Sequence, residues 1–294
     1  MILVTGATGF IGKGLTAKLL KKGYQVKVLT RNPELAKRLF PNAVVTEGNL
    51  SDKNSVKSAM KDVSKVVHLA GLVDYKDRKR LFEINCRCTQ NLLECCKHVD
   101  KFVYSSSVTV YGNVEGKADY KTEPHPSGPY GESKVMAENL VRDSGINSAI
   151  LRIAAVYGED SPWFDYFLKV MSLGIPYPRT ENKTQLVHLS DAVQGIALSV
   201  EKGKGTFIIA DEKPVKFAYI AEKIAHLLGK RYWTVPPWML TIPAKLLGMD
   251  ELIIESIENR VFDIARSEDA LGFKPRADIN SELKRMVDWY LKNR

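Results

Sequence analysis

Short apolar runs alternate along the first half of the chain with stretches whose apolar residues recur every three or four positions. The apolar runs predict strands at residues 1–5, 25–29, 43–46, 65–69, 101–104 and 148–153. Between the first two runs, Ile11, Leu15, Leu19 and Leu20 lie on one face of a predicted helix that stops at Gly23. Strands that alternate with helices in this way usually pair in parallel.

The alternation weakens beyond Gly158, where aromatic residues accumulate. We therefore predict an α/β protein with a doubly wound parallel Rossmann sheet and a smaller C-terminal α/β substrate domain. Residues 1–159 are expected to form the Rossmann domain, and residues 160–294 the substrate-binding domain. A strand-like run at 206–210 indicates that residues 184–212 fold back onto the first domain.

A glycine-rich turn, Gly6-Ala7-Thr8-Gly9-Phe10-Ile11-Gly12, joins the first strand to the first helix. The three glycines permit a tight turn and let backbone N–H groups approach a pyrophosphate, whose charge the helix N-terminus favours. A glycine triad in this strand-to-helix context predicts a dinucleotide site. The expected cofactor contacts in the turn are Gly6, Thr8, Gly9, Phe10, Ile11 and Gly12.

The ends of the next strands refine the cofactor prediction. Where a chain that selects NAD usually places an acid against the ribose 2′-hydroxyl, this sequence has Thr30-Arg31-Asn32. A guanidinium suits a 2′-phosphate, so Arg31 favours NADP, with NAD as the alternative. Further cofactor contacts are expected after the third and fourth strands, at Asn49, Leu50, Leu69, Ala70 and Gly71.

Candidate acid-base chemistry lies in Tyr130 and Lys134, four residues apart at the start of a predicted helix. This spacing places both side chains on one helix face, where a nearby cation favours phenolate over phenol. The run Ser105-Ser106-Ser107 brings hydroxyls to the same sheet edge, although serine runs are also typical of turns. Asp74 and Tyr75 are expected in a loop that either overhangs this edge or is an ordinary surface loop.

Composition excludes several other classes of protein. The chain has 294 residues, 45% hydrophobic and 26% charged, and its net charge of +9 is spread along its length. We therefore expect a solvated basic surface and no nucleic-acid partner. No apolar run reaches the roughly 18 residues of a membrane span and the chain opens on a strand, so we expect a cytoplasmic protein without a membrane partner. The cysteine spacings suit no metal cluster.

The motifs together resemble the extended short-chain dehydrogenase/reductase family, within the NAD-dependent epimerase/dehydratase superfamily. Five segments carry the resemblance and occur in the family's order within residues 1–160. They are Thr5-Gly6-x-x-Gly9-x-x-Gly12, His68-Leu69-Ala70-Gly71, Tyr104-Ser105-Ser106-Ser107-x-x-x-Tyr111-Gly112, Tyr130-x-x-x-Lys134 and Leu151-Arg152-x-x-x-x-Tyr157-Gly158.

The resemblance implies roles for individual residues. Ser107 would hold the substrate oxygen, Tyr130 would exchange its proton, and Lys134 would lower the tyrosine pKa and bind the nicotinamide ribose. Asn85 matches the family's helix asparagine near the active site, and Asn49 stands where the family often has an aspartate near the adenine. The resemblance also implies a homodimer through predicted helices at 79–97 and 130–143, which would bury the side of the first helix that carries the cysteines.

Within the family, two enzyme subgroups remain open. Nucleotide-sugar epimerases and dehydratases typically have an asparagine where this chain has Ala155, which counts against a nucleotide sugar. Residues 30–33 and the tail at 262–275 are similar to 3β-hydroxysteroid dehydrogenases and dihydroflavonol-type reductases. This similarity implies an NADP(H)-dependent oxidoreductase acting on a secondary alcohol or ketone. The alternatives are an epimerase or dehydratase with tightly bound NAD and, less favoured, a non-catalytic NADP sensor or scaffold.

Overall fold

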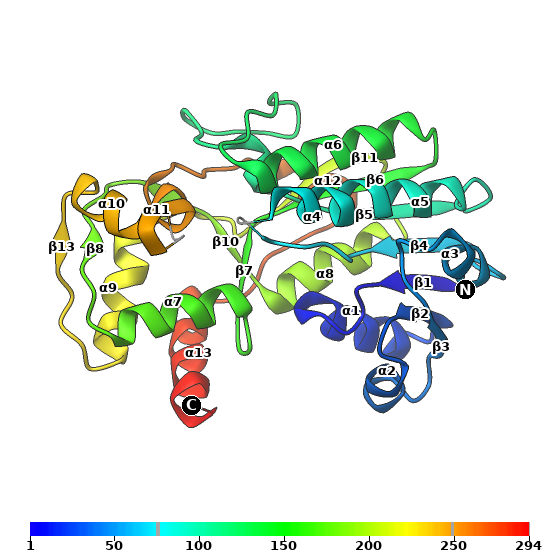
Figure 1. Ribbon diagram of the computed structural model, residues 1–294, viewed down its shortest axis with the longest axis horizontal. Coiled ribbons are helices and arrows are strands. Elements are labelled where there is room, and N and C mark those ends of the chain that lie inside the picture. Colours follow the sequence, from blue (N-terminus) through cyan, green and yellow to red (C-terminus); the bar gives the residue numbers. More distant parts are fainter. Residues whose placement is uncertain (75–76, 248–249, 294) are drawn as a thin grey trace.

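A seven-stranded parallel sheet forms the centre of the computed structural model, which describes residues 1–74, 77–247 and 250–293 (Figure 1). From edge to edge the strand order is β11–β6–β5–β4–β1–β2–β3. The strands are β1 (Ile2–Thr5), β2 (Val26–Thr30), β3 (Val44–Glu47), β4 (Lys65–His68), β5 (Lys101–Ser107), β6 (Ser148–Ile153) and β11 (Gly205–Ile209). The order reverses between β1 and β4, so the predicted doubly wound fold is confirmed and its ligand crevice lies at that reversal.

Helices cover both faces of this sheet. One layer contains α1 (Phe10–Lys21), α2 (Pro33–Leu39), α8 (Leu189–Ser199) and α12 (Ala265–Leu271), which share an apolar core with the sheet. The other contains α3 (Lys53–Ala59), α4 (Arg78–Phe82), α5 (Cys88–Glu94) and α6 (Pro129–Asp143). Residues of α3, α5 and α6 form a second core with the sheet, and α4 packs against α6. The strands are therefore buried on both sides, which accounts for their nearly unbroken apolar sequences.

A smaller α/β unit with its own core lies beyond the carboxyl edge of the sheet, at the left of Figure 1. Its helices are α7 (Pro162–Ser172), α9 (Phe217–Leu227), α10 (Trp238–Leu247), α11 (Asp250–Ile257) and α13 (Ile279–Asn293). Its short strands pair as β7 (Ala155–Tyr157) with β10 (Leu186–His188), β8 (Tyr177–Pro178) with β13 (Thr234–Val235), and β9 (Lys183–Thr184) with β12 (Val215–Lys216). The aromatic residues that mark the change in sequence pattern form much of this core.

The predicted helix at 79–97 is not one regular helix. A π-helical turn at Glu83–Arg87 separates α4 from α5, and α5 ends at Glu94. Cys86, Cys88 and Cys96 are buried by the chain's own packing, whereas Cys95 is only partly buried. The chain's own packing thus covers three of the four thiols, and the homodimer through these helices stays a prediction.

Two further segments differ in detail from the sequence-based expectations. The strand expected at 101–104 continues through Ser107, so the serine run is extended and a 3-10 turn, η2 (Val108–Tyr111), follows it. Between 184 and 212, β11 pairs with β6 in the central sheet, whereas β10 pairs with β7 outside it. Tyr75 lies outside the described residues. In the described parts of the chain, every helix is too short or too polar to cross a membrane.

Candidate functional site

The turn between β1 and α1 is built for close approach of backbone to a ligand. Gly6 has φ +72°, and a Cβ there would lie 2.7 Å from the Ala70 backbone nitrogen. A Cβ on Gly12 would collide with the Gly6 carbonyl oxygen, so the helix can pack against the turn only with glycine at position 12. Gly9 precedes α1 and has no side chain to cap it. The first N–H groups of α1 therefore face the crevice, where they attract an anion.

A cavity of about 330 Å³, here called the nucleotide cavity, opens in front of this turn. The predicted cofactor residues that line it are Gly6, Thr8, Gly9, Arg31, Asn49, Leu50, Leu69, Ala70 and Gly71. Phe10 and Gly12 are not among its lining residues, because α1 turns them away, and Ile11 lines a neighbouring cavity. Residues from four strand ends thus line one space, and their contacts with a dinucleotide stay a prediction.

The neighbouring cavity, about 210 Å³ and here called the reaction cavity, contains the candidate proton-exchanging residues. Ser107, at the end of β5, and Tyr130, in the first turn of α6, both line it. The Ser107 hydroxyl oxygen accepts hydrogen bonds from the Thr109 N–H and hydroxyl, at 3.2 and 3.0 Å. These bonds leave the Ser107 proton available to a substrate oxygen in the same cavity.

Lys134 lines neither cavity and lies between residues of the two. A Cβ on Gly71, which lines the nucleotide cavity, would be 3.3 Å from the Lys134 Nζ atom, and that atom lies 5.8 Å from the centre of the Tyr130 ring. The ammonium donates to the Ser105 carbonyl oxygen at 2.9 Å, and the side chain is buried. Burial lowers the pKa of Lys134 to about 8, although the Glu138 and Cys86 charges oppose this.

Replacing Lys134 by methionine is expected to change stability in a pH-dependent way in the cofactor-free protein. Because the folded-state pKa is about 8 and the ordinary value is 10.5, the unfolded chain binds this proton more tightly between those values. The natural protein should therefore gain about 3 kcal/mol of unfolding free energy, relative to the variant, as pH rises across that window. Urea unfolding of both proteins over this range measures the gain, and a constant difference would show that Lys134 is not desolvated.

Asn85, which is expected near the catalytic residues, is hydrogen-bonded to the loop that borders both cavities. Its amide oxygen accepts from the Leu72 N–H at 2.8 Å, and its amide nitrogen donates to the Leu72 carbonyl and the Ser133 hydroxyl, at 2.9 and 3.0 Å. Three hydrogen bonds to its own chain thus hold this buried side chain. The geometry makes Asn85 a positioning residue that ties the loop after β4 to α6.

His68, from the motif that follows β4, is held neutral. Its Nε2 atom lies 2.9 Å from the Thr89 hydroxyl, whose proton is given to the Asn85 carbonyl, so Nε2 carries the hydrogen and donates. Nδ1 then accepts from the Thr5 hydroxyl at 2.7 Å. Burial, with a contribution from the Lys134 charge, lowers the pKa of His68 to about 3. This histidine joins β1 to α5 and stays uncharged near neutral pH.

A buried carboxylate, Glu138, lies one helical turn beyond Lys134 and anchors the serine strand. It accepts from the Ser106 hydroxyl at 2.5 Å and from two nitrogens of the Arg152 guanidinium, the shorter contact being 2.8 Å. Arg152 in turn donates to the Tyr111 hydroxyl at 2.8 Å. Burial alone would raise the pKa of Glu138, but its bonds with Arg152 and Ser106 lower it overall. Arg152 and Tyr111, which belong to two of the sequence motifs, thus support β5 through this network.

Sequence reasoning missed three residues that shape the site. Glu138 continues the Tyr130–Lys134 spacing by another four residues, a signal that was visible. Arg80 lines the nucleotide cavity beside Arg31, and Trp163 lines the reaction cavity from the second unit. Those two depend on tertiary packing, which no local pattern reports. Among the described residues, no group of three His, Cys, Asp or Glu side chains is placed to hold a metal ion.

Comparison with known proteins gives a consistent picture. Residues 2–210 match the family model described as the NAD dependent epimerase/dehydratase family. The chain is 29% identical to UDP-glucose 4-epimerase of Vibrio cholerae, over 99% of this chain and 95% of that protein. It is 24% identical to the 3β-hydroxysteroid dehydrogenase/Δ5→4-isomerase of Mycobacterium tuberculosis, over 99% of this chain and 90% of that protein. The structure of UDP-glucuronic acid 4-epimerase from Bacillus cereus in complex with NAD has 25% identity and a TM-score of 0.78, covering 99% of this chain and 98% of that chain.

Proposed function

The chain belongs to the NAD dependent epimerase/dehydratase family, and we propose that it is an NADP(H)-dependent oxidoreductase of a secondary alcohol or ketone with an apolar body. When bound, the nicotinamide supplies or accepts the hydride at the substrate carbon. Ser107 donates a hydrogen bond to the substrate oxygen, and Tyr130 gives that oxygen a proton on reduction and removes it on oxidation. The Lys134 ammonium favours the phenolate form and binds the ribose.

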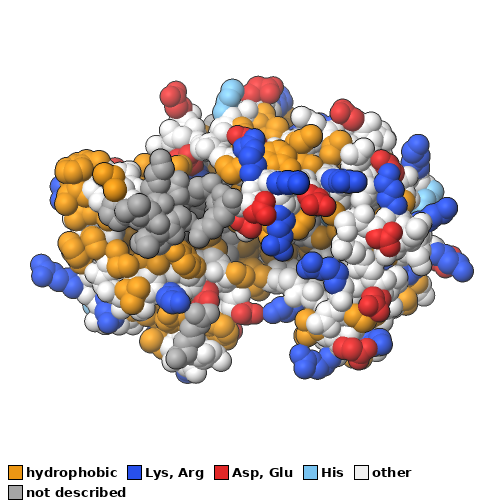
Figure 2. Space-filling model, in the orientation of Figure 1, with side chains coloured by type: hydrophobic (Ala, Val, Ile, Leu, Met, Phe, Trp, Pro, Cys, Tyr) orange, Lys and Arg blue, Asp and Glu red, His pale blue; other side chains and the backbone are white. Residues whose placement is uncertain are grey.

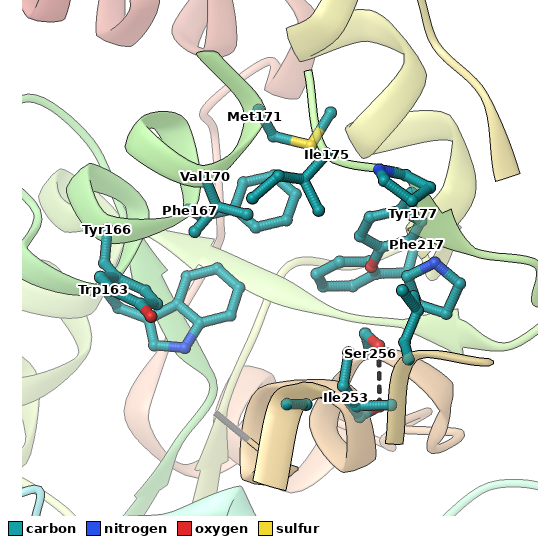
Figure 3. A pocket seen from close by; sticks show the side chains of 14 residues that line it. Trp163, Tyr166, Phe167, Val170, Met171, Ile175, Tyr177, Phe217, Ile253 and Ser256 are labelled. Carbon is teal, nitrogen blue, oxygen red and sulfur yellow. Dashed lines mark hydrogen bonds between the residues drawn. The ribbon is translucent and has the colours of Figure 1, made fainter. Parts of the chain in front are cut away.

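One observation carries the choice of an apolar substrate. Of the described residues that line the reaction cavity, Arg260 alone is charged, and its guanidinium pairs with the buried Glu258 carboxylate at 2.8 Å. A second cavity of about 140 Å³ shares Trp163 with the reaction cavity and is lined almost wholly by apolar and aromatic side chains (Figure 3). Burying a diphosphate needs several cations or N–H donors, whereas this surface favours hydrocarbon.

A nucleotide-sugar epimerase with tightly bound NAD is the second candidate. It is favoured by the 29% identity to the Vibrio cholerae enzyme over nearly the whole chain. The two candidates separate in a steady-state screen that follows nicotinamide absorbance with cyclic ketones and alcohols, and that follows UDP-glucose and UDP-glucuronic acid by chromatography. We expect turnover of apolar ketones with NADPH. Inversion of a UDP-sugar without net change in nicotinamide would establish the epimerase instead.

Cofactor choice should depend on Arg31. The described residues lining the nucleotide cavity include Arg31 and Arg80 but no Asp or Glu. Asp77 and Glu83 line an adjoining cavity that shares both arginines. Arg31→Ala is expected to weaken NADP binding by about 10- to 150-fold, the equivalent of 1.5–3 kcal/mol for a hydrogen bond to a charged group. NAD binding should change little, because NAD has no 2′-phosphate.

Fluorescence titration with NADPH and NADH measures both affinities in each protein. Arg38→Ala is a matched control, since Arg38 is exposed on α2 and does not line the cavity. Equal losses for both cofactors in Arg31→Ala would mean that Arg31 is structural. Tighter binding of NADH than of NADPH by the natural protein would favour the epimerase candidate.

The assembly that we propose is a homodimer formed by α4, α5 and α6. The side chain of Met136 on α6 is half exposed in the single chain, which suits a helix-bundle contact. Analytical ultracentrifugation across a range of concentrations tests this arrangement. A monomer at every concentration would remove it without affecting the proposed chemistry.

A further inference from the structure

An apolar surface covers the end of the second unit that is farthest from the central sheet. Three of its side chains are about 70% exposed: Leu173 at 69%, Trp238 at 71% and Ile242 at 72%. Figure 2 shows hydrophobic side chains gathered over this end of the molecule, at the left of the view. We call this surface the apolar end, and it consists of Leu173, Ile175, Trp233, Trp238, Met239 and Ile242.

Hydrogen bonds join the segments that carry these side chains. The Trp233 indole N–H donates to the Gly174 carbonyl at 3.1 Å, between the two residues Leu173 and Ile175. Strand β13 follows Trp233 directly and leads through Pro236 to α10. The Pro236 carbonyl accepts a hydrogen bond from the Met239 N–H at 3.0 Å. These bonds link the three segments that carry the apolar end, and large exposed apolar surfaces of this kind usually mark a binding surface.

Helix α10 is apolar on two sides, and its inner side faces the cavity drawn in Figure 3. Leu240 and Ala244 line that cavity, while Trp238, Met239 and Ile242 are exposed to solvent. Ile175 belongs to both surfaces, since it lines the cavity and is 41% exposed. Helix α10 and the loop at 173–176 thus separate the apolar end from the cavity drawn in Figure 3.

Three exposed cations are neighbours of the apolar end, two of them in the sequence and one through the pairing of β8 with β13. Lys230 and Arg231 directly precede the Tyr232-Trp233 segment, and the Arg179 N–H bonds to the Val235 carbonyl at 2.8 Å. None of these three forms an ion pair with any residue in the described ranges, whereas the neighbouring acid Glu181 is paired with Lys216. Burial, with a contribution from the Glu222 charge, raises the pKa of Tyr232, so Glu222 is a further acid beside this segment. The three cations still outnumber this acid, and an anionic surface would neutralise their excess.

We propose that the apolar end docks on an anionic lipid bilayer, from which an apolar substrate passes between α10 and the 173–176 loop into the cavity. Insertion of exposed tryptophan and aliphatic side chains at the headgroup level, with lysine and arginine facing the lipid phosphates, is how monotopic proteins bind membranes. No membrane-crossing helix is needed, so the absence of an apolar span in the sequence does not oppose this contact. The passage of substrate rests on the proposed function, but the docking does not.

A second copy of the chain is the other occupant that an apolar surface suggests. In a two-fold dimer through the apolar end, both copies would bring the same excess of cations, from Arg179, Lys230 and Arg231, to the rim of one contact. Like charges in a contact are unfavourable unless acids intervene. The excess of cations thus favours lipid phosphate over self-association.

Co-sedimentation of the full chain with vesicles tests the docking without substrate or cofactor. We expect binding to vesicles of phosphatidylcholine with phosphatidylglycerol and weaker binding to phosphatidylcholine alone. The double variant Trp238→Ser/Ile242→Ser should lose at least about tenfold in affinity, since burial of a large apolar side chain is worth about 1.5–3 kcal/mol. Lys230→Glu/Arg231→Glu should lose the preference for the anionic lipid.

Leu291→Ser is the matched control, because Leu291 is a 57% exposed leucine on α13, outside the apolar end. NADPH titration of every variant verifies that it is folded. The proposal is overturned if the natural protein stays in the supernatant with both vesicle types, or if Leu291→Ser reduces binding as much as the double variant. It is also overturned if Trp238→Ser/Ile242→Ser converts a dimer to a monomer and leaves vesicle binding unchanged.

Discussion

Tyr130→Phe is expected to reduce kcat by about 10²- to 10⁴-fold while leaving NADP affinity nearly unchanged. The substitution removes only the hydroxyl that exchanges a proton with the substrate, and general acid-base assistance is worth that range of rate. The ring remains in the reaction cavity, so its packing is kept. An interaction that strengthens only as charge moves in the transition state affects kcat and kcat/KM and leaves ground-state binding alone.

Lys134→Ala provides the comparison for this result. Lys134 lies between residues of the two cavities, so its loss should weaken NADP binding and lower kcat together. Steady-state kinetics and NADPH titration of both variants separate the two patterns. If Tyr130→Phe retains most of its activity on the best substrate, the assignment of Tyr130 is wrong and the sensor hypothesis becomes the better one.

Glu138→Ala is expected to lower the unfolding free energy by about 3–5 kcal/mol. The side chains of Glu138 and Arg152 are 0% and 3% exposed, and removal of the carboxylate leaves the buried guanidinium without a countercharge. Loss of one partner of a buried ion pair is costly for this reason. Ser106 also loses its acceptor, so β5 and Ser107 should be less well held.

Arg142→Ala is the matched control. Arg142 contacts the same carboxylate at 2.6 Å, but its own side chain is 39% exposed. Exposed ion pairs contribute about 0–1 kcal/mol, so this variant should be close to the natural protein in urea unfolding. A loss for Glu138→Ala as small as that for Arg142→Ala would mean that the buried network does not stabilise the fold.

The sequence predicts the parts of this molecule that depend on local pattern. The strand ends, the glycine turn and the meeting of Arg31, Asn49 and Gly71 follow from short apolar runs and parallel order, because parallel strands expose their carboxyl ends at one edge. Tyr130 and Lys134 are placed on one helix face by their spacing alone. These predictions need no knowledge of which segments pack together.

The remaining features depend on partners that lie far away in the chain. The π-helical turn at Glu83–Arg87 lies where the Asn85 side chain bonds to Leu72 and to Ser133 of α6, and a 3.6-residue pattern contains no sign of it. Trp163 reaches the reaction cavity only because the second unit folds back over the sheet edge. Exposed Trp238 and Ile242 look like core residues in the sequence, and their position outside the core is known only from packing.

Transfer of a labelled hydride tests the central claim most directly. The protein is incubated with NADPH deuterated at the transferable position and with the best apolar ketone from the screen, and the product is analysed by mass spectrometry. The account predicts an alcohol with one deuterium at the carbinol carbon and an equal amount of NADP⁺. Failure of the natural protein to transfer deuterium to any ketone, together with inversion of a UDP-sugar and no net oxidation of the cofactor, would contradict it.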